Sequence, residues 1–133
     1  MGRPEDTPII AIVDDDESVC RAIQRLVRSM GMHTSSFLSG DDFLSFVEGV
    51  RSFEPDCVIL DVQMRGTNGL TVQDRLRQRP SPPPVIFITA HDAPGVRERA
   101  LAGGAVAFLR KPFSDDVLMK TLETALRRRE SDC

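Results

Sequence analysis

Three short runs of the chain are apolar at nearly every position, and two weaker segments resemble them. The three runs are rich in β-branched residues, and strands that are apolar throughout are typical of parallel sheets covered by helices on both faces. These strong predicted strands are Ile9–Val13, Cys57–Leu60 and Val85–Ile88. The two weaker ones are Met32–Phe37, which is polar enough for a sheet edge, and Ala105–Leu109.

Helical spacing of apolar residues separates the predicted strands. After the first strand, one face of a predicted helix carries Val19, Ile23, Leu26, Val27 and Met30. Gly31 follows as a stop signal. Four further helices are predicted to begin near Ser39, Gly69, Pro94 and Ser114. Acidic residues follow Ser39 and Ser114, as expected for capping serines.

The predicted strands begin near residues 9, 33, 57, 85 and 105. This rhythm gives one strand and one helix per step, which predicts an α/β fold with a five-stranded parallel sheet and right-handed crossovers. No linker divides the chain, so we expect a single domain over residues 1–133. Its core is expected at about 8–127, followed by a short C-terminal tail at 128–133.

Composition narrows the class of protein. Of 133 residues, 41% are hydrophobic and 28% charged, as in an ordinary folded domain. No apolar run is long enough to cross a membrane and no signal peptide precedes the first strand, so we expect a cytoplasmic location. The net charge of −3 argues against nucleic acid as a direct partner. Three widely spaced cysteines fit neither a disulfide framework nor a zinc site.

Unusual polar residues stand where the predicted strands end. They are Asp14, Asp15, Asp61, Thr89 and Lys111. The carboxyl ends of parallel strands share one edge of the sheet, where open α/β folds bind ligands. Each residue alone has an ordinary explanation, such as a helix cap, a turn or a solvated lysine. Their joint placement favours a site, and Asp61 is the hardest to explain otherwise because it follows an entirely apolar strand.

Clustered carboxylates need a cation or a raised pKa, because two unit charges about 4 Å apart repel by about 4 kcal/mol at an effective dielectric constant near 20. Oxygen ligands without His or Cys favour Mg²⁺ or Mn²⁺. With such an ion, Asp61 could attack a phosphorus atom as a nucleophile. Thr89 and Lys111 could then bind the oxygens of the transferred phosphoryl group.

These residues resemble the receiver domain of response regulators in two-component signalling. The resemblance extends from about Ile9 to Leu126, and its pattern consists of Val13-Asp14-Asp15, Asp61-Val62-Gln63-Met64 with Gly69, Ile88-Thr89-Ala90, Phe108 and Lys111-Pro112-Phe113. It implies a flavodoxin-like three-layer sandwich with strand order 2-1-3-4-5 and five helices on both faces.

The resemblance also implies a role for each residue. Asp61 is the phosphorylation site, and Mg²⁺ (or Mn²⁺) is held by Asp15, Asp61 and the backbone carbonyl of Gln63, with Asp14 acting indirectly or through water. Lys111 binds the phosphoryl group, in a loop where the bond to the following proline is usually cis. Thr89 binds the phosphoryl group too and forms a switch pair with Phe108.

Four positions depart from the family pattern or tune it. Arg65 stands where the family often has proline, which adds a donor and a charge near the site. Phe108 lacks the hydroxyl of the commoner tyrosine. Gln63 and His91 lie where the family tunes loss of phosphate, and His91 is expected to be an exposed loop residue rather than a catalytic base.

The function implied is a phosphoacceptor switch rather than a turnover enzyme. Its expected partners are a sensor histidine kinase or phosphotransfer protein, an unidentified downstream target, and a second copy in a phosphorylation-dependent homodimer. The changing surface is expected to comprise the fourth helix, fifth strand and fifth helix. We expect no membrane partner, and either a stand-alone receiver or a fragment of a longer regulator.

Two alternatives share parts of the constellation. A haloacid-dehalogenase-like phosphatase also uses an aspartate nucleophile at a strand end, but it needs a second Asp where this chain has Gln63, and its acidic pair follows the lysine in the chain. A flavin-binding module would need a phosphate loop rich in Ser and Thr, whereas the segment 14–17 is entirely acidic and would repel a phosphate.

Overall fold

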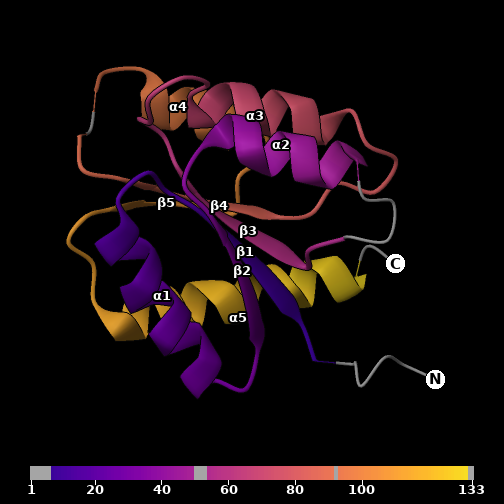
Figure 1. The fold of residues 1–133 in the computed structure, drawn as a ribbon, viewed down its shortest axis with the longest axis vertical. Coiled ribbons are helices and arrows are strands. Elements are labelled where there is room, and N and C mark those ends of the chain that lie inside the picture. The colour runs from indigo at the N-terminus through magenta and orange to yellow at the C-terminus, as the bar shows by residue number, and fades with distance from the viewer. Residues whose placement is uncertain (1–6, 50–53, 92, 132–133) are drawn as a thin grey trace.

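The computed structural model describes residues 7–49, 54–91 and 93–131. Strands and helices alternate along these residues (Figure 1). The strands are β1 (Ile9–Val13), β2 (His33–Phe37), β3 (Cys57–Asp61), β4 (Val85–Thr89) and β5 (Ala107–Arg110). The helices are α1 (Glu17–Ser29), α2 (Gly40–Gly49), α3 (Gly69–Arg77), α4 (Val96–Ala102) and α5 (Asp115–Ser131).

All neighbouring strands are parallel, and their order is β2-β1-β3-β4-β5. This confirms the predicted fold class and strand order. The register pairs Asp61 with Ile88 and Thr89 with Arg110. The carboxyl ends of β1, β3, β4 and β5 therefore lie along one edge of the sheet.

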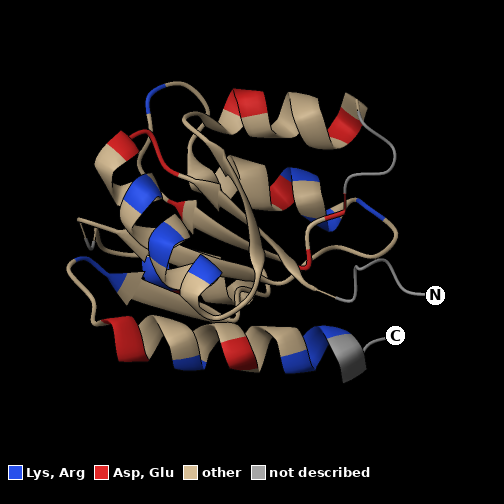
Figure 2. Ribbon diagram, turned by 60° about the horizontal axis from the view of Figure 1, so that its bottom comes forward, with Lys and Arg blue, Asp and Glu red and all other residues tan. Residues whose placement is uncertain are grey.

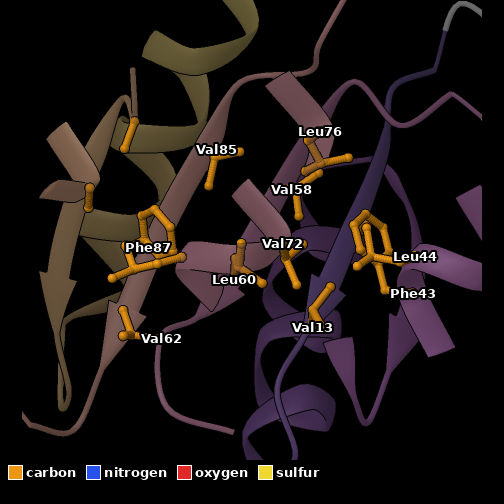
Figure 3. Close-up of a cluster of buried hydrophobic side chains, with 14 of the residues drawn as sticks. Val13, Phe43, Leu44, Val58, Leu60, Val62, Val72, Leu76, Val85 and Phe87 are labelled. Atoms are coloured by element: carbon orange, nitrogen blue, oxygen red, sulfur yellow. The ribbon is translucent and has the colours of Figure 1, made fainter. Parts of the chain in front are cut away.

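Side chains of the central strands alternate between two hydrophobic layers. Val58 and Leu60 point to the layer covered by α2, α3 and α4, while Cys57 and Ile59 point to the layer under α1 and α5. Figure 1 shows these two groups of helices on opposite faces of the sheet. Figure 3 shows the first layer, where Phe43 of α2 and Phe87 of β4 belong to one cluster of buried side chains. The central strands are thus buried on both faces, as their composition predicted.

The observed bounds differ from the predicted ones at two strands that matter for the site. β3 and β4 each continue one residue further, so that Asp61 and Thr89 belong to the sheet. Pairing of Asp61 with Ile88 and the hydrogen bond from the Val62 N–H to the Ile88 carbonyl, 3.1 Å long, extend the ladder to these polar residues. Both side chains are consequently fixed by strand geometry.

The last strand differs from expectation, and the last helix reaches the end of the described residues. β5 begins two residues later than predicted, because the Ala105 N–H is used by the end of α4, where it donates to the Ala100 carbonyl. α5 continues to Ser131, past the expected end of the core near residue 127. Arg129 anchors this extra turn through ion pairs with Asp56 (3.4 Å) and Glu54 (3.9 Å).

The helix termini follow the predicted capping chemistry. The hydroxyl of Ser39 accepts the Asp42 N–H at 3.0 Å, and that of Ser114 accepts the Val117 N–H at 3.2 Å. Figure 2 shows the acidic start and basic end of α5, an arrangement that complements the helix dipole. Despite its 17 residues, this helix is too polar to cross a bilayer, and no other helix in the described part of the chain could do so.

Cysteine chemistry plays no part in the described core. Cys20 and Cys57 are buried and form no disulfide. Burial raises the pKa of the Cys20 thiol to about 11 and that of Cys57 to about 12, so both stay protonated at neutral pH. Cys133 lies outside the described residues.

Gly69 lets the first turn of α3 pack against the end of β3. Its N–H donates to the Val62 carbonyl at 2.8 Å. A Cβ atom at this position would lie only 2.3 Å from the backbone oxygen of Asp61. The glycine therefore permits a backbone approach that brings α3 directly behind the acidic strand end.

We predict that Gly69→Ala lowers the free energy of unfolding by about 1–3 kcal/mol, because backbone atoms must move to admit the methyl group. Gly49→Ala is the matched control, since nothing lies within 4 Å of a Cβ there. It should leave stability unchanged or raise it by up to about 1 kcal/mol. Circular dichroism during urea unfolding measures both, and equal stability of the two variants would contradict the prediction.

Candidate functional site

Three carboxylates meet at the carboxyl edge of the sheet. Asp14 and Asp15 follow β1, and Asp61 ends the neighbouring strand β3. One carboxylate oxygen from each residue lies within 4.8 Å of those from the other two. The structure thus brings Asp61 next to two acids that lie 46 and 47 positions earlier in the sequence, as the topology predicted.

Burial makes this cluster electrostatically unusual. Asp14 is fully buried and Asp61 is 4% exposed, whereas Asp15 is half-buried. The pKa of the Asp61 carboxyl is raised to about 7, first because burial strips water from its charged form and then because Asp14 is negative. Lys111 and a hydrogen bond from the Gln63 N–H oppose this rise in pKa, while Asp15 adds to it. A cation at this position would relieve the repulsion.

Lys111 directly follows β5 and reaches the cluster along the same edge of the sheet. Its Nζ atom lies 2.7 Å from Asp14 Oδ2 and 3.8 Å from Asp61 Oδ2, and its side chain is only 19% exposed. Its backbone N–H donates to the Thr89 carbonyl at 2.7 Å, which fixes the residue to the end of β4. The bond between Lys111 and Pro112 is cis, as the family resemblance implied. The ammonium group is therefore held next to two carboxylates.

The neighbouring acids of the β1–α1 loop have different partners. Asp16 caps α1: its carboxylate accepts the N–H and hydroxyl of Ser18, and these bonds lower its pKa. Asp14 instead accepts the Asp16 N–H at 2.8 Å. The ordinary explanation by helix capping therefore holds for Asp16 alone, and the carboxylates of Asp14 and Asp15 face the cluster.

Thr89 is buried at the end of β4, but its hydroxyl is bonded to the following loop. The Oγ1 atom donates to the His91 carbonyl at 2.7 Å and accepts the His91 N–H at 3.1 Å. His91 itself is an exposed loop residue, as expected. The structure thus places Thr89 beside the site with its hydroxyl engaged elsewhere.

Phe108 of β5 points into the protein. It is 6% exposed, and its ring centroid lies 6.3 Å from that of Phe87. The guanidinium carbon of Arg97 on α4 lies 5.8 Å from the Phe108 centroid, within the range of a cation–π contact. Phe108 thus contacts Phe87 within the sheet and Arg97 of α4.

Two contacts at the site were missed by sequence reasoning. Arg65 touches Asp15, 50 positions earlier in the chain, and Arg97 covers Phe108. From the position of Arg65 in the loop after β3, the sequence predicted a positive charge near the site. It did not predict that this charge would contact Asp15. Arg97 gave none, because an exposed arginine on a short helix is ordinary in sequence terms.

The donor set suits a hard divalent cation. Carboxylate oxygens dominate the cluster, and the nearby Cys20 thiol is protonated and donates to the Asp14 carbonyl at 3.3 Å instead. Gln63 lies two residues after Asp61, in the loop that follows β3, and is exposed. Magnesium and manganese prefer such ligands.

Several known proteins have sequences similar to this chain. Response regulator protein TmoT of Ectopseudomonas mendocina is 38% identical over 119 residues, which cover 90% of this chain and 53% of TmoT. Transcriptional regulatory protein FixJ of Bradyrhizobium diazoefficiens is 33% identical over 121 residues, covering 91% and 58%. The chain therefore spans little more than half the length of these relatives.

A solved structure and a family model give the same assignment. The crystal structure of a response regulator receiver protein from Burkholderia phymatum is 54% identical, with a TM-score of 0.81, and the match covers 90% of this chain and 95% of that one. The model of the response regulator receiver domain matches residues 10–123. The chain that carries this acidic cluster belongs to the response regulator receiver domain family.

Proposed function

We propose that Asp61 accepts a phosphoryl group from a phosphohistidine of a sensor histidine kinase or phosphotransfer protein. The observation that carries this proposal is the position of Asp61 at the end of β3, beside two carboxylates and 3.8 Å from the Lys111 ammonium. Family membership supports a phosphoaccepting role in signalling.

The transfer requires a single displacement at phosphorus. A carboxylate oxygen of Asp61 forms the new P–O bond, and the P–N bond to the donor imidazole breaks, which leaves an acyl phosphate on the protein. Lys111 neutralises charge on the phosphoryl oxygens. Thr89 contributes its hydroxyl after it leaves the His91 backbone. Small Ala90, beside Thr89, is exposed and leaves the approach to Asp61 open.

A divalent cation completes this site in the proposal. Asp15, Asp61 and the Gln63 carbonyl would hold Mg²⁺, or Mn²⁺ in its place, and Asp14 would act indirectly or through water. The three carboxylates within 4.8 Å support this assignment. When bound, the ion neutralises charge that accumulates on the phosphoryl oxygens.

The phosphorylated state is read by the surface formed by α4, β5 and α5. Movement of the Thr89 hydroxyl toward the phosphoryl group frees the loop at His91, next to α4. Phe108 then repacks between α4 and β5, where Arg97 now covers it. A shift from a minor to a major population needs only a few kcal/mol. This surface would bind a downstream target or a second copy of the chain.

This role is that of a switch in the cytoplasm, not of a phosphatase acting on external substrates. Gln63 occupies the position where a haloacid-dehalogenase-like phosphatase needs a second acid. The net charge of −3 gives no reason to assign nucleic acid as a direct partner.

Phosphorylation provides the first test. Incubation with acetyl phosphate and Mg²⁺ should add one labile phosphoryl group, detected by intact mass spectrometry. Asp61→Asn should abolish the gain, because the amide is a poor nucleophile. Asp74→Asn, a change of the same chemistry on the exposed face of α3, should retain it. Equal labelling of Asp61→Asn would refute the assignment, and so would steady hydrolysis of simple phosphomonoesters by the unmodified protein.

Mg²⁺ binding provides the second test. Because a ligand that binds only the folded state stabilises it, Mg²⁺ at ten times its dissociation constant should add about 1.4 kcal/mol, or a few degrees in melting temperature. Asp15→Asn and Asp61→Asn should lose this rise, while Asp74→Asn should keep it. Circular dichroism is the measurement, because the chain has no Trp and no Tyr. A melting temperature that does not change when Mg²⁺ is added would argue against an ion at these carboxylates.

The pH dependence of stability provides the third test. The pKa of Asp61 is about 7 in the folded protein, against 3.8 for an ordinary aspartate such as that of the unfolded chain, so folding favours the protonated form. This contribution to stability is complete below pH 3.8 and is lost as the pH rises through 7. In EDTA, Asp61→Asn should therefore gain stability relative to the unmodified protein between pH 5 and pH 8, by at most about 3 kcal/mol. A constant difference between the two proteins over this range would contradict the raised pKa.

A further inference from the structure

Asp15 is engaged by a single residue on the facing loop. The backbone N–H of Arg65 donates to Asp15 Oδ2 at 3.2 Å, and Nε of the same residue lies 3.9 Å from the same oxygen. The contact links the β1–α1 loop to the loop after β3, on either side of the acidic cluster. The oxygen that Arg65 approaches belongs to a carboxylate of that cluster.

The loop that carries Arg65 is anchored near both of its ends. The Thr67 hydroxyl donates to the Asp41 carboxylate, and the Gly69 N–H donates to the Val62 carbonyl at 2.8 Å. Asn68, between them, accepts the Thr71 N–H at 3.1 Å and caps α3. These bonds anchor the ends of the loop from which the Arg65 N–H donates to Asp15.

The side chain of Arg65 behaves differently from its backbone. It is 93% exposed, and its guanidinium contact with Asp15 is long. Lys111, the other cation at the cluster, is 19% exposed and lies 2.7 Å from Asp14. An exposed ion pair of this length is weak and is easily exchanged for water or another cation. The Lys111 ammonium is therefore held at the cluster, whereas the Arg65 guanidinium can move away from it.

The two cations divide the three carboxylates between them. Lys111 forms ion pairs with Asp14 and Asp61, and Arg65 forms one with Asp15. In the proposed function Asp15 is a ligand of the divalent cation. A guanidinium group and a divalent cation at the same carboxylate oxygen repel each other, so the presence of one disfavours the other.

We propose that Arg65 is a positioning residue that sets the affinity of the site for Mg²⁺. Its N–H orients Asp15, and its guanidinium group is a displaceable counterion that competes with the ion for that carboxylate. The Mg²⁺ concentration at which the site fills is therefore higher than the carboxylates alone would give. This inference rests on the proposed function, since it takes Asp15 as an ion ligand.

Titration calorimetry with MgCl₂ on the unmodified protein and four variants tests the inference. Arg65→Gln keeps the N–H and removes the charge, so it should bind Mg²⁺ about 3- to 10-fold more tightly. Arg65→Glu should bind more tightly still, and Arg65→Lys should stay close to the unmodified protein. Arg77→Gln, at the far end of α3 and 55% exposed, is the matched control for net charge and should change nothing. Added KCl should narrow the difference between Arg65→Gln and the unmodified protein.

The outcomes separate this inference from the function on which it rests. Equal or weaker binding by Arg65→Gln, with the unmodified protein still binding Mg²⁺, overturns the role of Arg65 and leaves the phosphoacceptor site intact. Tighter binding by Arg77→Gln of the same size also overturns it, because the effect would then be one of net charge. If neither the unmodified protein nor Arg65→Gln binds Mg²⁺, the proposed ion site itself fails. Melting curves in EDTA verify that each variant is folded.

Discussion

The carboxylate of Asp61 is held where its negative charge is unfavourable, and the rest of the site follows from that constraint. Two further acids lie within 4.8 Å, the Asp61 side chain is nearly shielded from water, and among the described residues Lys111 alone offers a mostly buried opposite charge. An arrangement of this kind is poorly stable until positive charge or a phosphoryl group with its ion enters. The fold therefore maintains a repulsion between carboxylates that a bound ligand can relieve.

The carboxylates stay close together despite this repulsion because the sheet that carries them is rigid. Strands buried on both faces fix where β1 and β3 end, and Gly69 lets α3 pack directly against the last residue of β3. Alternate side chains of each strand enter separate hydrophobic layers, so a shift of one residue would exchange the layers. The positions of Asp14 and Asp61 are thus set by the packing of residues that have no chemical role.

Most of the fold and the positions of the acids could be predicted from local pattern. Apolar runs located β1, β3 and β4, and parallel topology brought their ends to one edge. The contacts that escaped prediction join distant segments: Arg65 with Asp15, and Arg129 with Asp56. An exposed arginine has no preferred partner in its own segment, so the sequence leaves its contact undetermined.

The hydrogen bonds of Thr89 have a consequence for how readily the protein changes state. Its hydroxyl must abandon the N–H and carbonyl of His91 before it can turn elsewhere. Because His91 is exposed, solvent molecules can satisfy both backbone groups as soon as the hydroxyl departs. No buried polar group is stranded, and the barrier to the rearrangement is accordingly one of side-chain rotation rather than of desolvation.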